Sequence, residues 1–191
     1  MIDKGKKVFL DSKILDIDET VTRAVSGIAD LGISFLTVHG NGAAIRAAIK
    51  GRGNKNLKIL SVTILTSLDA ADMLDLGLSR SVEEYVMYRT KNALDAGCDG
   101  VIASGLEAKK IREMAGDHLL IVTPAIRSEG VAHDDQKRVS TPAEAISNGA
   151  DYLVVGREIT KATDPGKGAE RIIMQIEKAL PPPLPIPAEI N

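Results

Sequence analysis

The sequence contains no tryptophan, and aromatic side chains make up only 3% of its 191 residues. Proteins that bind single-stranded nucleic acid commonly stack the bases on aromatic rings, so this scarcity argues against that class. The formal net charge is −2, from 24 basic and 26 acidic residues. Such a balance gives no general attraction to nucleic acid or to anionic membranes. Any recognition of a phosphate group must therefore come from a local cluster of donors.

Cysteine is almost missing as well, because Cys98 is the only one. This count excludes an intrachain disulfide framework and a zinc cluster, and we read Cys98 as a small residue near a helix–strand junction. No window is long and apolar enough to span a membrane, and "MIDKGKK" lacks the apolar core of a signal peptide. The simplest expectation is a cytoplasmic enzyme with no membrane partner.

Six short apolar runs alternate with helical patterns along the chain. The runs, which are typical of parallel strands covered on both faces, lie at 7–11, 33–39, 58–65, 100–104, 119–124 and 152–156. The helical patterns lie at 18–32, 41–53, 81–97, 107–116, 141–149 and 166–180, with one or two extra turns within 69–77. Ser81 and Thr141 are expected N-caps. This alternation predicts a parallel α/β sheet, either doubly wound or closed into a barrel.

The domain boundaries follow from the same pattern. No long linker divides the alternating segments, so we expect one domain over residues 1–180. The last eleven residues, "PPPLPIPAEIN", cannot continue a helix because of their prolines. We therefore expect 181–191 to be an extended, weakly ordered tail.

A cluster of charges follows the first apolar run, in "FLDSKILDIDETV". Because side chains alternate along a strand, Asp11 and Lys13 are expected to point the same way. The carboxyl ends of parallel strands carry the active sites of such proteins. Asp16 follows in the loop and could also serve as the N-cap of the next helix. Taken alone, the pair is equally compatible with a surface salt bridge, which is nearly neutral in energy.

Several stretches together resemble the orotidine 5′-phosphate decarboxylase family. They are "FLDSKILDIDETV", "TVHG", "SVTILTSL" and the long segment "IVTPAIRSEGVAHDDQKRVSTPAEAISNGADYLVVGREIT". The resemblance runs from about Gly5 to Leu180, with the motifs in the order of the family. It implies a TIM (β/α)8 barrel and a carboxy-lyase that converts orotidine 5′-phosphate to uridine 5′-phosphate (UMP) in pyrimidine biosynthesis. It also implies that no metal or cofactor is needed, and a homodimer with shared active sites.

The resemblance assigns roles to individual residues. It makes Lys13 the residue that protonates C6 of the pyrimidine, places Asp11 beside the leaving carboxylate, and brings Asp16 into the neighbouring site of the dimer. A fixed ammonium aimed at C6 stabilises the negative charge that develops there. The implied substrate-binding residues are Thr20, Thr66, Pro124, Arg127, Gln136, Gly156 and Arg157. Among these, Gln136 would bridge phosphate and base, Gly156 and the two arginines would hold the phosphate, and the loop 128–138 would close over it.

The sequence departs from the family pattern at three places. Ala125 stands where glycine is usual, and because alanine tolerates φ > 0 poorly, we expect that turn to be adjusted. Asp18 and Glu19 replace a Pro-Asn pair. Glu158 replaces a proline and brings a negative charge next to the implied phosphate site. We expect these changes to affect ligand affinity more than the fold.

The implied barrel is incomplete in this sequence. In the family the Asp-x-Lys-x-x-Asp strand is the third of eight, whereas only "MIDKGKK" precedes it here; residues 1–4 suit a last helical turn that stops at Gly5. We therefore expect six strand–helix units, two bare sheet edges and weak or absent decarboxylation. Two other readings remain open. One is an inactive relative that keeps only nucleotide-phosphate binding or dimerisation, and the other is a metal-dependent decarboxylase of a sugar-acid phosphate.

Overall fold

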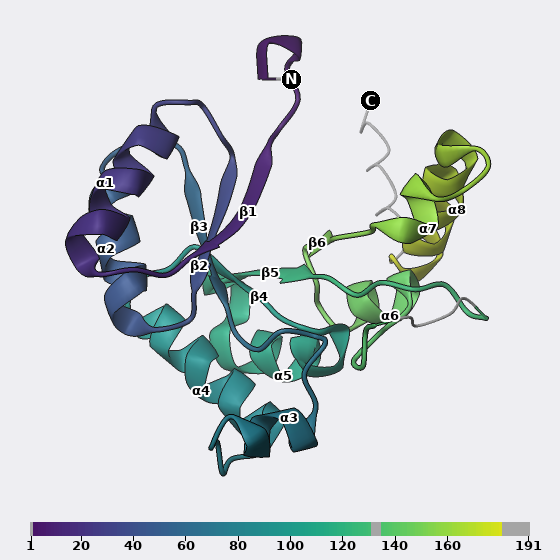
Figure 1. Cartoon of the computed structure of the whole chain (residues 1–191). Coiled ribbons are helices and arrows are strands. Elements are labelled where there is room, and N and C mark those ends of the chain that lie inside the picture. The colour runs from purple at the N-terminus through teal and green to yellow at the C-terminus, as the bar shows by residue number, and fades with distance from the viewer. Residues whose placement is uncertain (1, 131–134, 181–191) are drawn as a thin grey trace, which may run out of the picture.

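The sheet has six parallel strands in the order in which they occur along the chain (Figure 1). The computed structural model describes residues 2–130 and 135–180, so the predicted tail over 181–191 lies outside the described residues. The strands are β1 (Phe9–Ile14), β2 (Phe35–His39), β3 (Lys58–Val62), β4 (Gly100–Ile102), β5 (Leu120–Thr123) and β6 (Tyr152–Leu153). Each strand overlaps a predicted apolar run, which confirms the parallel α/β sheet.

Helices follow the strands where the periodicity predicts them. They are α1 (Asp18–Ala29), α2 (Gly42–Arg52), α3 (Ala70–Asp75), α4 (Val82–Asp95), α5 (Gly105–Ala115), α6 (Pro142–Ser147), α7 (Arg157–Thr160) and α8 (Pro165–Ala179), with 3₁₀ turns η1 (Ile2–Lys4) and η2 (Gly116–His118). Ser81 and Thr141 cap α4 and α6 as predicted, each accepting a hydrogen bond from a backbone N–H three residues later. The short helix α7 was not predicted.

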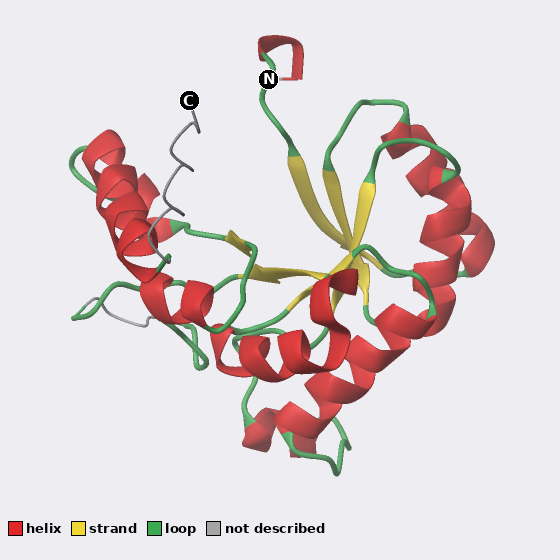
Figure 2. Ribbon diagram, turned by 180° about the vertical axis from the view of Figure 1, so that it is seen from behind, coloured by secondary structure: helices red, strands yellow, loops and turns green. Residues whose placement is uncertain are grey.

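The sheet is curled into an open trough, with the helices on its convex side (Figure 2). Strands β1 and β6 form the two edges, and among the described residues each pairs with one neighbouring strand only. The rings of Phe35 on β2 and Tyr152 on β6 meet inside the trough, with centroids 5.2 Å apart. The chain therefore has the expected incomplete TIM barrel of six strand–helix units.

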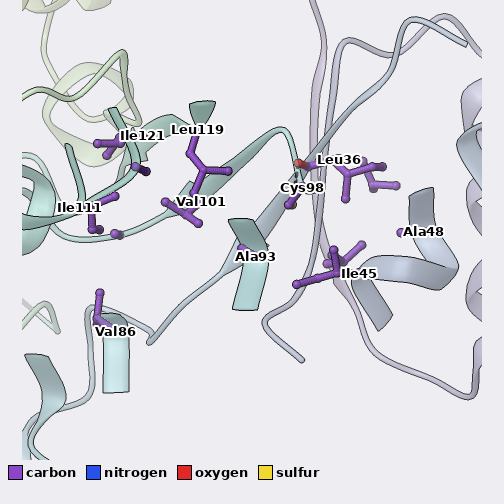
Figure 3. Close-up of a cluster of buried hydrophobic side chains, with 14 of the residues drawn as sticks. Leu36, Ile45, Ala48, Val86, Ala93, Cys98, Val101, Ile111, Leu119 and Ile121 are labelled. Atoms are coloured by element: carbon purple, nitrogen blue, oxygen red, sulfur yellow. Dashed lines mark hydrogen bonds between the residues drawn. The ribbon is translucent and has the colours of Figure 1, made fainter. Parts of the chain in front are cut away.

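The main hydrophobic core lies between the convex face of the sheet and the helices. Leu36, Val101 and Ile121 from the strands belong to one buried cluster with Ile45 of α2 and Ile111 of α5 (Figure 3). Burying each large aliphatic side chain contributes about 1.5–3 kcal/mol. A second, smaller cluster on the concave face contains Leu60, Val62, Ile102 and Val122. The strands are thus covered on both faces near their middle, which explains their lack of polar alternation.

Cys98 lies between α4 and β4, at a helix–strand junction as predicted. It is 5% exposed, and its sulfur contacts the carbonyl oxygens of Ile59 at 3.1 Å and Gly100 at 3.3 Å. Burial raises the pKa of the Cys98 thiol to about 11, so the group remains a protonated packing residue at neutral pH.

The described residues contain no helix with both the length and the apolar character that a membrane span needs.

Gly5 ends the first turn as predicted: its φ is 68°, and its backbone N–H donates to the carbonyl of Ile2 at 2.8 Å. That left-handed conformation is easy for glycine because it has no Cβ.

Candidate active site

A cavity of about 210 Å³ opens at the carboxyl ends of the strands. Its walls come from β1, from the ends of β3 and β4, and from the segments that follow β3, β5 and β6. They are Phe9, Asp11, Lys13, Val62, Ile64, Leu65, Thr66, Ser67, Ile102, Pro124, Ala125, Gln136 and Val154. Five of the predicted site residues are among them: Asp11, Lys13, Thr66, Pro124 and Gln136. Curling of the sheet brings these separate strand ends together.

Asp11 and Lys13 lie side by side within β1. The Lys13 ammonium donates to Asp11 Oδ2 at 2.6 Å, and the side chains are 39% and 45% exposed. Both face the cavity. The pair is therefore accessible to a ligand and fixed in direct contact.

Thr37 of β2 holds this pair in place. Its buried hydroxyl donates to Asp11 Oδ1 at 2.8 Å and accepts from the backbone N–H of Lys13 at 2.9 Å. Lys13 has a left-handed φ of 48°, which costs an ordinary residue about 1–2 kcal/mol, and the β1–β2 register shifts between Leu10 and Ile14. Strain of this kind persists only where surrounding contacts enforce it, and it is concentrated at functional sites.

Thr37 was not predicted to be a site residue. The available signal was a hydroxyl residue within the apolar run that ends in "TVHG". A threonine fits a strand for its β-branched shape alone. The pattern therefore did not separate packing from hydrogen bonding to the Asp11–Lys13 pair.

Asp16 and Thr20 lie outside the residues that line the cavity. Asp16 is exposed on the loop after β1, and its Oδ1 accepts from the backbone N–H of Ile17 at 2.7 Å. The alternative reading of Asp16 as a helix N-cap is wrong, because the N-cap of α1 is Ile17, which makes no side-chain capping bond. Thr20 is exposed in the first turn of α1.

Thr66 and Gln136 meet across the cavity mouth although they are 70 residues apart in sequence. The buried Thr66 hydroxyl is hydrogen-bonded to the Gln136 side chain. On the next wall, Ala125 adopts a φ of 60° and is 7% exposed. The expected adjustment of this turn is therefore absent, and the turn keeps the left-handed conformation at the cost of strain.

The arginines assigned to the phosphate lie close to a carboxylate. Arg157 is the first residue of α7, directly after Gly156, and it pairs with Asp135. Hydrogen bonding to Arg157, together with the charges of Arg157 and Arg127, holds the pKa of Asp135 below its usual value. Arg127 itself is 6% exposed and donates to the carbonyl of Ile126 at 2.8 Å. The three residues form a local charge cluster; residues 131–134 of the expected loop lie outside the described residues.

Glu158, whose negative charge is expected next to the phosphate site, binds Ser128, the residue that follows Arg127. Its Oε2 accepts from the backbone N–H of Ser128 at 3.0 Å, and its Oε1 from the Ser128 hydroxyl. That hydroxyl also accepts from Gln175 of α8 at 2.8 Å. The carboxylate thus ties the start of the 128–138 segment to α7 and α8.

No group of three or more His, Cys, Asp or Glu side chains in the described part of the chain could hold a metal ion.

Comparison with known proteins places the chain among enzymes of one family. The sequence model of the orotidine 5′-phosphate decarboxylase / HUMPS family matches residues 1–172. The orotidine 5′-phosphate decarboxylase of Nitrobacter winogradskyi is 52% identical over 182 residues, which cover 95% of this chain and 76% of that protein. The enzyme of the same name from Methylococcus capsulatus is 49% identical over 174 residues, or 91% of this chain and 71% of that protein.

Solved structures agree with the sequence relatives. The crystal structure of orotidine 5′-phosphate decarboxylase from Lactobacillus acidophilus matches with a TM-score of 0.78 and 37% identity, covering 92% of this chain and 77% of the other. An uncharacterised conserved protein from Geobacillus kaustophilus matches with a TM-score of 0.75 and 33% identity, covering 92% and 78%. The chain therefore belongs to the orotidine 5′-phosphate decarboxylase / HUMPS family.

Proposed function

We propose that the chain binds orotidine 5′-phosphate in the cavity at the strand ends and decarboxylates it to UMP. The observation that carries the proposal is the Asp11–Lys13 pair, which faces the cavity and is held by Thr37 in a strained conformation. The named relatives, decarboxylases of this substrate, support it. We further propose that the reaction takes place in the cytoplasm.

In the proposed reaction the bond between C6 and the carboxylate carbon breaks, carbon dioxide leaves, and the electron pair stays on C6. The Lys13 ammonium lies beside that carbon, stabilises the developing charge and then gives its proton to C6. Asp11 holds the ammonium by their 2.6 Å contact and lies next to the departing carboxylate. The mechanism proposed here uses these side chains without a metal or cofactor.

The phosphate binds, in this proposal, at the cluster of Arg127, Arg157 and the backbone of Gly156. Guanidinium groups bind phosphate oxygens through paired, charge-assisted hydrogen bonds. A phosphate there would replace Asp135 as the anionic partner of Arg157. Gln136, which lies on both the cavity wall and the 135–138 segment, bridges phosphate and base, while Thr66 and Pro124 contact the pyrimidine.

We also propose a homodimer in which Asp16, and with it Thr20, serves the neighbouring site. Asp16 is exposed beyond the Asp11–Lys13 pair, between the exposed apolar residues Leu15 and Ile17. Mixing an Asp16→Ala chain with a Lys13→Ala chain should restore part of the activity, because one hybrid site regains both side chains. Verified heterodimers without any recovery would contradict shared sites.

A second candidate is nucleotide binding with little catalysis. The partial exposure of Asp11 and Lys13 favours it, because water around a charge pair weakens its effect on a reacting carbon. The experiment that separates the candidates adds orotidine 5′-phosphate to the purified chain, follows its ultraviolet absorbance and measures UMP affinity by calorimetry. Turnover supports the decarboxylase, and UMP binding without turnover supports the binding protein. The absence of both turnover and UMP binding would overturn both candidates.

The same assay also tests the metal-dependent reading. Activity that is unchanged by a chelator supports the proposed mechanism. Activity that appears only with added magnesium, and on a sugar-acid phosphate in place of the nucleotide, would contradict it.

A further inference from the structure

Arg138 is a buried charge two residues beyond Gln136. It is 8% exposed, and its guanidinium donates to Glu107 Oε1 at 2.8 Å and to the carbonyls of Ile64 at 3.0 Å and Leu65 at 3.2 Å. Glu107 is 5% exposed in the first turn of α5. One side chain thus joins three parts of the chain: the 135–138 segment, the residues after β3, and α5.

The backbone repeats this connection. The N–H groups of Lys137 and Arg138 both donate to the carbonyl of Thr66 at 3.1 Å. The Arg138 carbonyl accepts from the buried hydroxyl of Ser104 at 3.2 Å. These bonds place Gln136 opposite the Thr66 side chain, to which it is hydrogen-bonded.

Stability alone does not account for the buried pair. Removing two charges from water is costly, and apolar replacements of buried ion pairs are often neutral or stabilising. Here the pair is also incompletely satisfied, since Glu107 Oε2 and Arg138 Nε are buried without a hydrogen-bond partner among the described residues. Burial raises the pKa of Glu107, and the neighbouring charge of Arg138 opposes this shift.

We infer that Arg138 is a positioning residue which, through Glu107 and the carbonyls after β3, sets the place of Gln136 in the cavity and so the affinity for the phosphorylated ligand. Its fixed fork of donors reaches the carboxylate and both carbonyls at once. An apolar side chain would fill the same space but lose these three side-chain hydrogen bonds, so that only the backbone bonds to Thr66 and Ser104 would hold the 136–138 segment. The inference rests on the proposed function, because it assigns Gln136 to the ligand.

A second contact fixes the other side of the segment. The Lys137 ammonium bridges Asp69 at 2.9 Å and Asp72 at 2.7 Å, at the start of α3. These three side chains are 35–44% exposed, so solvent and salt weaken the bridge. We therefore expect Lys137→Met to change ligand affinity much less than substitution of Arg138.

The test compares Arg138→Met with the double variant Glu107→Leu/Arg138→Met. The single variant leaves Glu107 buried without its partner, so it should be destabilised. The double variant removes both charges and should unfold at a higher temperature than the single one. If Arg138 positions Gln136, the double variant still binds UMP about tenfold or more weakly than the natural chain, with a smaller loss for uridine. Arg138→Lys keeps the charge but loses the forked set of donors, so it should show an intermediate loss of UMP affinity. This variant replaces Arg138→Met in the comparison if Arg138→Met does not fold.

Arg112→Met is the matched control. Arg112 also binds backbone carbonyls and a carboxylate, that of Asp151, but at the opposite ends of the strands. The Arg112→Met variant should have a lower unfolding temperature and an unchanged UMP affinity. Hydrogen exchange at the amides of Lys137 and Arg138 should accelerate in the double variant and stay unchanged in the control.

The outcomes separate this inference from the proposed function. A double variant with natural UMP affinity and natural amide protection would show that the pair only stabilises the fold. Failure of the natural chain to bind UMP would overturn the proposed function instead. In that case amide exchange decides: faster exchange in the double variant than in Arg112→Met supports the positioning role, and equal rates contradict it.

Discussion

At the amino ends of the strands the polar groups are paired, whereas at the carboxyl ends several are strained or unpaired. Asp99, just before β4, pairs with Arg52 and accepts from the Ile59 N–H at 2.9 Å. The arrangement recurs two strands later, where Asp151, just before β6, pairs with Arg112 at 2.7 Å and accepts from the Ile121 N–H at 2.7 Å. In each case the aspartate accepts from a backbone N–H near the start of a strand, and its arginine partner comes from the helix that precedes that strand.

At the carboxyl ends of the strands, by contrast, some polar groups are unpaired and some backbone conformations are strained. Lys13 and Ala125 are left-handed, and Glu107 Oε2 and Ser140 Oγ are buried without a hydrogen-bond partner in the part of the chain that the structure describes. Left-handed conformations of ordinary residues and unpaired buried polar atoms each cost free energy. The difference indicates that the amino ends stabilise the fold, while the carboxyl ends retain costly features that serve the cavity.

The largest effect that separates the two ends is expected for Lys13→Met. Loss of the ammonium should lower the rate of decarboxylation by about a thousandfold or more, because charge stabilisation and protonation are both removed. The matched control is Lys7→Met, two residues before the same strand begins, which should leave the rate unchanged. Equal rate losses in the two variants, measured by ultraviolet absorbance, would contradict the assignment of Lys13.

The next largest effect concerns stability at the amino ends. Asp99→Ala leaves Arg52 unpaired and exposes the Ile59 N–H, so it should lower the free energy of unfolding by roughly 3 kcal/mol. Asp151→Ala should cost less, because the Asp151 side chain is 34% exposed against 14% for Asp99. Denaturant titration measures both, and UMP affinity should stay unchanged; a greater loss for Asp151→Ala would contradict the proposed order.

A smaller effect is expected at the phosphate cluster. Arg157→Ala should weaken UMP binding by about 1.5–3 kcal/mol, the usual range for a hydrogen bond to a charged group, and leave uridine binding nearly unchanged. Arg171→Ala on the exposed side of α8 is the control. Calorimetry measures both affinities, and equal losses of affinity for UMP and uridine would contradict the assignment of the phosphate to Arg157.

The smallest effect is a gain in stability at the carboxyl ends. Ala125→Gly relieves a left-handed conformation that costs about 1–2 kcal/mol, less about 0.5–1 kcal/mol for the greater freedom of glycine in the unfolded chain. The net gain should lie between about 0 and 1.5 kcal/mol. Ala108→Gly within α5 should instead destabilise, and thermal unfolding of the two variants compares them. A loss of stability in Ala125→Gly would show that the turn is not strained.

Much of the fold was predictable from local pattern. Apolar runs and helical periodicity located each strand and most helices, because each element carries its own signal within a few residues. Alternation along β1 also predicted that Asp11 and Lys13 share a face, as their 2.6 Å contact shows. The four-residue helix α7 was missed, because a helix that short has no period to detect.

The sequence by itself determined the parallel α/β class, the family and the pair on β1, since these depend on neighbouring residues. Only the tertiary structure decided that Thr37 holds that pair, that Lys13 is left-handed and that Arg138 meets Glu107. Thr37 lies 26 residues from Asp11, and Arg138 lies 31 residues from Glu107. The first contact follows from the pairing of β1 with β2, and the second from the packing of the 135–138 segment against α5. No local spacing in the sequence encodes either contact, because each depends on which distant segments become neighbours in the fold.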